Sequence, residues 1–203
     1  MVAILKQGGL FDKPAIDGQA PDIVGLQYIP NFIDGRIEAA LIQNIDTQPW
    51  ITELKRRVQH YGYRYDYKVR GLTSDLYLGL IPEWLQPCCQ KLHSEGYFIR
   101  TPDQVIVNEY LPGQGIASHT DCIPCFGDTI ASISLGSGCQ MDFVGGEAKT
   151  AYYLEPQSLL ILSGEARYHW KHGIAARKSD KINNTAIPRA RRLSLTFRNV
   201  ILN

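Results

Sequence analysis

A series of short β-type segments in the second half of the chain constrains the fold more than any other feature. From Val105 onward, eight runs rich in apolar and β-branched residues are separated by turn residues. They are VIVNEYL, IASHTD, TIASISLG, CQMDFV, TAYYLE, SLLILSG, YHWKHGI and RLSLTFRNVIL. A closed double sheet would pair most strand edges and leave an interior that can house a ligand. We therefore predict a mainly β fold with flanking helices (α+β), built on a double-stranded β-helix, or jelly roll.

The first half of the chain predicts two helices and no second domain. Residues 1–24 contain several glycines and prolines and predict an irregular N-terminal arm. Asp34 is a suitable N-cap for a helix over DGRIEAALIQNI, and Pro82–Glu95 has the apolar spacing of a second helix. A length of 203 residues suits one compact domain, which we assign to residues 25–203. The stretch AARKSDKINNTAIPRAR predicts one long polar loop.

Composition excludes several classes of protein. A net charge of +1, with 44% hydrophobic and 20% charged residues, argues against a disordered, fibrous or strongly basic protein. No run approaches the roughly 18 to 20 apolar residues that a membrane helix needs. We therefore expect a cytoplasmic protein, or a nuclear one if the source is eukaryotic, with no membrane partner. No obligate protein partner is evident.

Five cysteines, an odd number, fit reduced thiols better than a disulfide framework. Cys122 and Cys125 form a C-x-x-C motif, which could be half of a zinc site or a redox pair. The remaining thiols are the adjacent Cys88 and Cys89, in a predicted helix, and Cys139. We favour incidental small residues over a structural zinc site.

A His-x-Asp pair, His119 and Asp121, is a candidate metal site. Residues two apart in a strand point to the same face, so the two side chains would lie together. By itself such a pair is more often a satisfied histidine than a ligand. His172, in the β-type run YHWKHGI, would complete a set of two histidines and one carboxylate. His169 in the same run is the alternative, and Gly173 favours His172 because it allows close backbone approach.

The last β-type run, RLSLTFR, has strictly alternating faces. Paired hydrogen bonds from arginines to carboxylates make its polar face a plausible clamp for 2-oxoglutarate. The alternative is an amphipathic edge strand with solvated arginines. The polar face contains Arg192, Ser194, Thr196 and Arg198, and the apolar face contains Leu193, Leu195 and Phe197.

The segment RRVQHYGYRYDYKVR, Arg56 to Arg70, combines basic residues with tyrosines at every second position. Tyrosines on one face can stack on nucleic-acid bases while basic side chains meet phosphates. The other interpretation is a half-buried strand with aromatic core contacts and a solvated charged face. The residues alone favour this second interpretation. The four tyrosines are Tyr61, Tyr63, Tyr65 and Tyr67.

The motifs NEY, HTD, HGI and RLSLTFR, in this order, resemble the AlkB family of Fe(II)- and 2-oxoglutarate-dependent dioxygenases. Further stretches are most similar to the oxygenase domain of the branch that hydroxylates modified wobble uridine in tRNA. The resemblance covers about residues 25–202. It implies Fe(II), 2-oxoglutarate and O2 as cofactors and the jelly-roll fold.

The resemblance also implies roles for individual residues. The iron ligands would be His119, Asp121 and His172, because the family's ligand histidine precedes Gly-Ile. It favours a nucleotide-recognition lid around residues 55–72, with base contacts from Arg57, Tyr61, Tyr63 and Tyr65. The 2-oxoglutarate site would consist of Asn108, Tyr110, Arg192, Ser194, Thr196 and Arg198.

The implied function is oxidation of an alkylated or modified base, with release of succinate and CO2. The outcome would be demethylation of DNA or RNA, or hydroxylation of a tRNA base, on a single-stranded or flipped-out substrate. Repair members often carry an acidic residue shortly after His-x-Asp, whereas Cys122, Ile123 and Pro124 follow here. This departure puts repair of 1-methyladenine and 3-methylcytosine in doubt. Alternatives are the same chemistry on a protein side chain or small metabolite, and a non-catalytic binding module.

Overall fold

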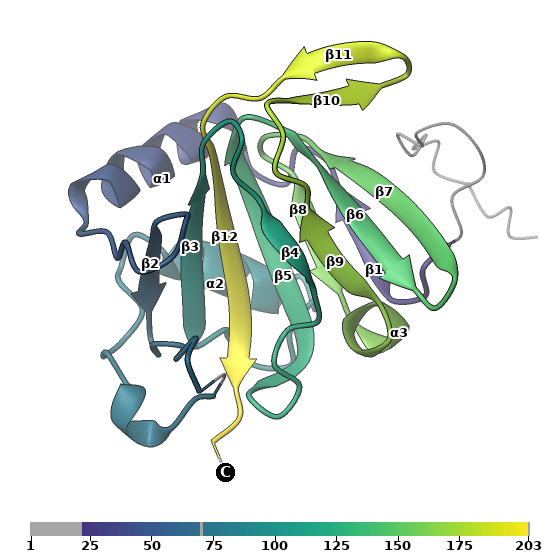
Figure 1. The fold of residues 1–203 in the computed structure, drawn as a ribbon. Helices are drawn as coiled ribbons and strands as arrows, with labels where there is room; N and C mark the ends of the chain where they lie inside the picture. Colours follow the sequence, from purple (N-terminus) through teal and green to yellow (C-terminus); the bar gives the residue numbers. More distant parts are fainter. Residues whose placement is uncertain (1–21, 70, 203) are drawn as a thin grey trace, which may run out of the picture.

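The structure is a computed structural model that describes residues 22–69 and 71–202. Most of the predicted arm over residues 1–24 therefore lies outside the described residues. Two antiparallel sheets pack against each other, as the jelly-roll prediction requires (Figure 1). None of the described helices is long and apolar enough to cross a membrane.

The larger sheet has six strands, in the order β1-β8-β5-β12-β3-β2. The smaller sheet has four, in the order β4-β9-β6-β7. Seven of the eight predicted runs form strands close to their expected bounds, and the run YHWKHGI forms one only from Lys171. The larger sheet comprises β1 (Leu26–Ile29), β2 (Val58–Tyr61), β3 (Gln104–Tyr110), β5 (Phe126–Gly136), β8 (Leu159–Leu162) and β12 (Arg192–Val200). The smaller comprises β4 (Ile116–His119), β6 (Cys139–Gly145), β7 (Ala148–Leu154) and β9 (Lys171–Ile174).

Two helices pack on the outer face of the larger sheet. Helix α1 (Gly35–Thr47) begins where predicted, and the Asp34 side chain accepts a hydrogen bond from the Ile37 backbone N–H at 2.8 Å. Helix α2 (Gln86–Ser94) begins four residues later than predicted. Pro82–Leu85 forms a separate turn, and Pro87 occupies the first turn of the helix, where its missing N–H costs nothing. A short 3-10 helix, η1, spans Ser74–Leu76.

Two further elements differ from the sequence prediction. The predicted polar loop before the last strand contains a hairpin, β10 (Ser179–Ile182) and β11 (Thr185–Pro188), which projects from the body (Figure 1). Asn183 and Asn184 turn the hairpin with positive φ, which asparagine tolerates better than most residues. The start of YHWKHGI is not strand: α3 (Gly164–Tyr168) ends there, and His169 is its C-cap.

Strand β12 divides the protein into two interiors. Leu193, Leu195 and Phe197 face the helices and belong to a cluster that contains residues of α1 and α2. The opposite face of β12 points between the two sheets. The cluster there includes Tyr110, Phe143 and Ile174 from both sheets. The strict alternation of the last strand thus places its polar residues inside the protein.

Candidate metal centre and cofactor pocket

His119 and His172 are brought together by strand pairing. They occupy directly opposed positions of the antiparallel pair β4 and β9, and their ring centroids lie 4.6 Å apart. His119 Nδ1 lies 2.8 Å from the Ala117 carbonyl oxygen, which leaves Nε2 for a metal. Burial lowers the pKa of His172 to about 4, although the nearby Asp121 carboxylate favours protonation. His172 is therefore neutral at pH 7, as a metal ligand must be.

Asp121 reaches the same point from outside the strand. Because β4 ends at His119, the alternation argument from sequence is wrong in its geometry. Arg198 donates from Nε and Nη2 to Asp121 Oδ1 at 3.1 and 2.6 Å, and Asp121 Oδ2 lies 3.6 Å from His172 Nε2. Burial alone would raise the pKa of Asp121, but the Arg198 guanidinium outweighs it and holds this pKa well below its usual range. The carboxylate is therefore ionised.

The ligand atoms of the three predicted residues lie within 4.8 Å of one another. Within the described residues, this is the one group of three or more potential ligands that converges in this way. His169, the alternative ligand, is not a member. The resemblance-based choice of His172 therefore agrees with the geometry. The group consists of His119, Asp121 and His172.

A cavity of about 270 Å³ lies beside the three potential ligands, between the two sheets. Ser194 and Thr196 of β12 contribute to its wall, and the Ser194 hydroxyl lies 2.8 Å from that of Ser132 on β5. Arg56, from the loop before β2, also lines the cavity, and its Nε donates to Asn108 Oδ1 at 2.8 Å. Of the six residues predicted to hold 2-oxoglutarate, five line this cavity: Asn108, Tyr110, Ser194, Thr196 and Arg198.

The sixth, Arg192, lines a small adjoining pocket that shares Tyr110 with the main cavity. Its guanidinium carbon lies 5.5 Å from the centroid of the Tyr110 ring. Arg192 is 2% exposed, and its Nη2 donates to Ser134 Oγ at 2.8 Å. Its Nε and Nη1 are buried without a hydrogen-bond partner. Unpaired buried donors on a cation are costly, and a carboxylate oxygen at either nitrogen would offset part of that cost.

The tyrosine-rich segment is divided between the two interiors. Tyr61 packs edge-on against Trp84 in the cluster under the helices, and Tyr63 contacts Tyr77 with the two rings tilted by 49°. Tyr65 and Tyr67 line the cavity. The four tyrosines therefore do not share one face.

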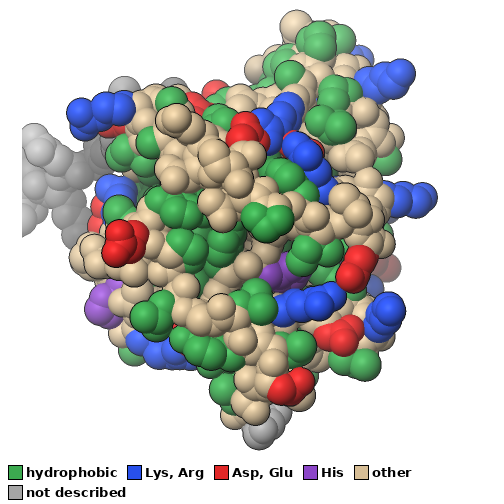
Figure 2. Space-filling view, turned by 90° about the vertical axis from the view of Figure 1, so that its left-hand side faces the viewer, with side chains coloured by type: hydrophobic (Ala, Val, Ile, Leu, Met, Phe, Trp, Pro, Cys, Tyr) green, Lys and Arg blue, Asp and Glu red, His purple; other side chains and the backbone are tan. Residues whose placement is uncertain are grey.

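Arg57 lies away from the cavity. Its guanidinium is bound to Glu109 and covers the Trp50 ring, 4.4 Å from the ring centroid. Figure 2 shows hydrophobic side chains in the middle of one face, with basic and acidic side chains interspersed around them. Basic charge on this face is therefore local rather than continuous.

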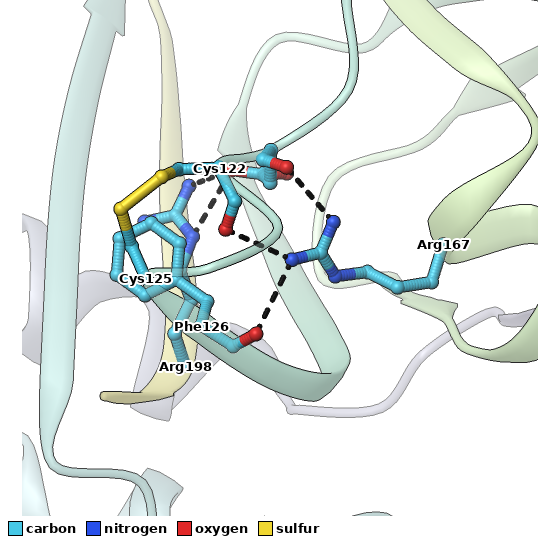
Figure 3. The surroundings of a disulfide bond; sticks show 6 residues. Cys122, Cys125, Phe126, Arg167 and Arg198 are labelled. Atoms are coloured by element: carbon cyan, nitrogen blue, oxygen red, sulfur yellow. Dashed lines mark hydrogen bonds and ion pairs between the residues drawn. A yellow bond between two sulfur atoms is a disulfide. The ribbon is translucent and has the colours of Figure 1, made fainter. Parts of the chain in front are cut away.

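The C-x-x-C motif forms a disulfide between Cys122 and Cys125 (Figure 3). The expectation of reduced, incidental thiols is wrong for this pair. Cys88, Cys89 and Cys139 are free and buried, as expected of small core residues. Cys122 also lines the cavity, directly after the potential ligand Asp121. The disulfide therefore closes the loop that follows the metal centre.

The residues present fit both implied cofactors. Two histidine nitrogens and one ionised carboxylate suit Fe(II) and leave three adjacent positions open. An unpaired nitrogen of Arg192 suits an oxygen of the distal carboxylate of 2-oxoglutarate. Sequence reasoning named these residues, but it did not place Arg56 at the cavity and gave no role to Arg167, a buried arginine on α3. The arginine in the run GEARY, shortly before HGI, was the available signal.

Comparison with known proteins gives the same assignment. The 2OG-Fe(II) oxygenase superfamily matches residues 25–198. The Alkylated DNA repair protein ALKBH8 homolog of Arabidopsis thaliana is 36% identical over 204 residues, covering 88% of this chain and 59% of that protein. The tRNA (carboxymethyluridine(34)-5-O)-methyltransferase ALKBH8 of Mus musculus is 38% identical over 167 residues, covering 78% of this chain and 25% of that protein. The chain thus spans only part of either relative.

Solved structures share the fold. The structure of OsALKBH1 has a TM-score of 0.61 and 20% identity, covering 86% of this chain and 96% of that one. The jelly-roll prediction is therefore confirmed. With a family match over most of its length and AlkB-type relatives, the chain belongs to the 2OG-Fe(II) oxygenase superfamily.

Proposed function

We propose that the protein uses Fe(II), 2-oxoglutarate and O2 to oxidise an alkylated or modified base in nucleic acid. The observation that supports this most directly is one cavity with three converging metal ligands at its wall and an unsatisfied buried arginine behind it. The names of the AlkB-type relatives refer to alkylated DNA and to a modified uridine of tRNA. Their chemistry supports a nucleic-acid substrate, with single-stranded RNA or DNA, including tRNA, as the form to test.

The site residues would hold the cofactors at fixed points. His119, Asp121 and His172 would bind Fe(II), and Arg192 would bind the distal carboxylate of 2-oxoglutarate, with Asn108, Tyr110, Ser194 and Thr196 around it. Together, the bound cofactors supply oxidation of a substrate C–H bond, with release of succinate and CO2. Arg198 keeps the Asp121 carboxylate ionised and oriented.

We further propose that the segment around residues 55–72 recognises the base. Tyr65 and Tyr67 reach the cavity, with ring centroids 5.2 Å apart, so a flipped-out base could stack between the cavity wall and an aromatic ring. Arg56 adds a positive charge at the same wall. Placement outside the cavity makes Arg57, Tyr61 and Tyr63 weaker candidates for direct base contact than the sequence suggested.

Succinate formation tests the function. Purified protein with Fe(II) and 2-oxoglutarate would be given short oligonucleotides that carry alkylated bases or wobble-type modified uridines, and in parallel a peptide mixture. We expect succinate and an oxidised nucleoside from at least one oligonucleotide, and none from a His172→Ala variant. Turnover of peptides with none on any oligonucleotide would overturn the nucleic-acid part. Absence of 2-oxoglutarate consumption under all conditions would favour a non-catalytic binding module.

A matched pair of variants tests the base-recognition segment. Tyr65→Ala should raise the KM for the oligonucleotide by roughly tenfold or more, because stacking on one base contributes about 1–3 kcal/mol. Tyr63→Ala, from the same segment but outside the cavity, should leave this KM within about twofold. Equal effects of the two substitutions would contradict the assignment.

A further inference from the structure

Arg167 on α3 is an unusually buried cation. It is 2% exposed and is the largest of the fully buried side chains in the described chain. Each hydrogen bond recorded for its guanidinium goes to a backbone carbonyl. None of the ion pairs recorded among the described residues includes Arg167. Burying a cation without a carboxylate partner costs several kcal/mol, so its place in the fold calls for a physical reason.

The carbonyls that Arg167 binds all belong to the loop that carries Asp121 and to the start of β5. Nη1 donates to the Asp121 carbonyl at 2.9 Å and Nη2 to the Cys122 carbonyl at 3.2 Å. Weaker bonds of 3.4 Å reach the carbonyls of Phe126 and Gly127. Figure 3 shows Arg167 and Arg198 approaching this loop from opposite sides. One guanidinium thus connects both ends of the loop.

The three potential metal ligands differ in how their backbones are fixed. His119 and His172 sit in paired strands, where cross-strand hydrogen bonding sets their distance. Asp121 lies in the loop after β4 and has no strand partner. Arg198 holds its carboxylate, and Arg167 holds its carbonyl oxygen. A residue held only at its carboxylate could still change backbone angle, whereas one held at both ends cannot.

We propose that Arg167 is a positioning residue that fixes the backbone of Asp121 and thereby sets the metal affinity of the centre. It would not touch metal, cofactor or substrate. This inference rests on the metal-binding role of Asp121 in the proposed function. The Arg167 guanidinium on α3, buried behind the loop that carries Asp121, would then be part of what positions the metal ligands.

Metal titration tests the proposal without any nucleic acid. Co(II) would be added to the apo protein and its affinity measured by visible absorption, together with the thermal stability of the apo form. Arg167→Gln should weaken Co(II) binding by roughly tenfold or more, as loss of an outer partner of a metal ligand usually does. Arg167→Lys, which keeps the charge and can retain some of the carbonyl contacts, should give an intermediate affinity.

Arg189, whose side chain is 6% exposed, provides the matched control. Arg189 is bound to Asp180 and to the Ala175 carbonyl at the base of the hairpin. Arg189→Gln should lower stability while leaving Co(II) affinity within about twofold, since the residue is not bonded to the Asp121 loop. If Arg189→Gln loses as much Co(II) affinity as Arg167→Gln, the effect of Arg167 would be one of overall protein stability. That result would overturn the proposal.

A double-variant comparison tests whether Arg167 acts through Asp121. In an Asp121→Ala background, Arg167→Gln should cause little further loss of Co(II) affinity, because the ligand it positions is gone. Additive losses would overturn the proposal. If Arg167→Gln does not fold, Arg167→Lys decides, and unchanged Co(II) affinity in it would count against the inference. If the parent protein does not bind Co(II), the proposed metal centre is overturned as well. If the parent binds Co(II) and the Arg167 variants bind it equally well, only the proposal for Arg167 fails.

Discussion

The two faces of the six-stranded sheet have opposite chemistry although they share the same strands. Towards the helices, β12 presents Leu193, Leu195 and Phe197 to a cluster of apolar and aromatic side chains. Towards the smaller sheet it presents two buried arginines and two hydroxyl residues beside a cavity. One face therefore provides packing. The other contains Arg198, which is paired with Asp121, and Arg192, which has two buried nitrogens without a partner.

Substitutions at neighbouring residues of β12 should therefore alter stability and function separately. Buried charges are a poor source of stability, and removal of one partner from a buried pair is destabilising. The fold tolerates such groups on one face because the other face is closely packed. Of two substitutions one residue apart on β12, one should mainly lower the stability of the fold and the other should mainly affect ligand binding.

The largest expected effect is on the packed face. Phe197→Ala should lower the free energy of unfolding by about 3–5 kcal/mol, since Phe197 is fully buried and the substitution leaves a cavity. Thr196→Ala, one residue away and facing the ligand cavity, should cost less than about 1 kcal/mol. Chemical denaturation of both apo variants measures the difference. Similar losses would show that the two faces contribute equally to stability.

The polar face should make stability sensitive to pH through His60 on β2. Burial, with added repulsion from Arg198, lowers the pKa of His60 from 6.5 to about 4. The unfolded chain therefore binds this proton first, and stability is complete above pH 6.5 and falls as the pH drops towards 4. The full loss is on the order of 3 kcal/mol.

Denaturation of the parent protein and of His60→Gln between pH 7 and about 5 checks this expectation. Glutamine can still accept the hydrogen bond from the Tyr65 backbone N–H, which His60 Nδ1 accepts at 3.4 Å. The variant should lose less stability than the parent protein over this range. Parallel curves would assign the acid sensitivity to other groups.

Arg192 and Arg198 should respond differently to truncation. Arg192→Met should weaken 2-oxoglutarate binding by roughly tenfold or more, because a charge-assisted carboxylate pair is lost. The same change should leave the apo protein as stable or more stable, because two unpaired buried nitrogens disappear. Arg198→Met should instead destabilise the apo protein, since Asp121 loses its partner. Calorimetric titration with 2-oxoglutarate measures the binding, and thermal unfolding measures the stability of each apo variant. Destabilisation of the apo protein by Arg192→Met would contradict the expectation for Arg192.

The smallest effect is expected from the disulfide. Replacing both Cys122 and Cys125 with serine should weaken Co(II) binding by less than roughly tenfold. Loss of an outer partner of a metal ligand usually weakens metal binding by at least about that factor. The effect should be smaller here because Arg167 still holds the carbonyls of the loop. The same titration applied to the oxidised parent protein and the double variant checks it. A larger loss than in Arg167→Gln would reverse the order of the two contributions.

Sequence reasoning succeeded where a strand keeps its alternation over several residues. β12 has this pattern, and its polar side lies inside the protein as predicted. It failed for short strands that depend on distant partners: β1 has four residues and pairs with β8, more than a hundred residues away. The β10–β11 hairpin was missed because its residues are polar, and polarity suggests a loop whether or not the backbone is paired.

The three potential metal ligands could be predicted as residue types in a known order, but their arrangement in space could not. Asp121 is placed by two arginines from distant elements, which no local spacing records. The tyrosine pattern failed for a local reason. Gly62 has φ of 76°, and a Cβ there would lie 1.8 Å from the Asp103 carbonyl oxygen. This glycine breaks the alternation between Tyr61 and Tyr63, so the later tyrosines turn towards the other interior.

The pairing of β1 with β8 affects how the protein can be shortened. Leu26–Ile29 covers one side of β8, whose other side is bound to β5. A chain trimmed beyond residue 25 would leave the backbone groups of Leu159–Leu162 open to another copy. We expect such truncated chains to associate edge to edge and precipitate, even though Leu26–Ile29 does not line the cavity beside the potential metal ligands. Solubility during purification would therefore depend on a four-residue strand on the opposite edge of the sheet from β2.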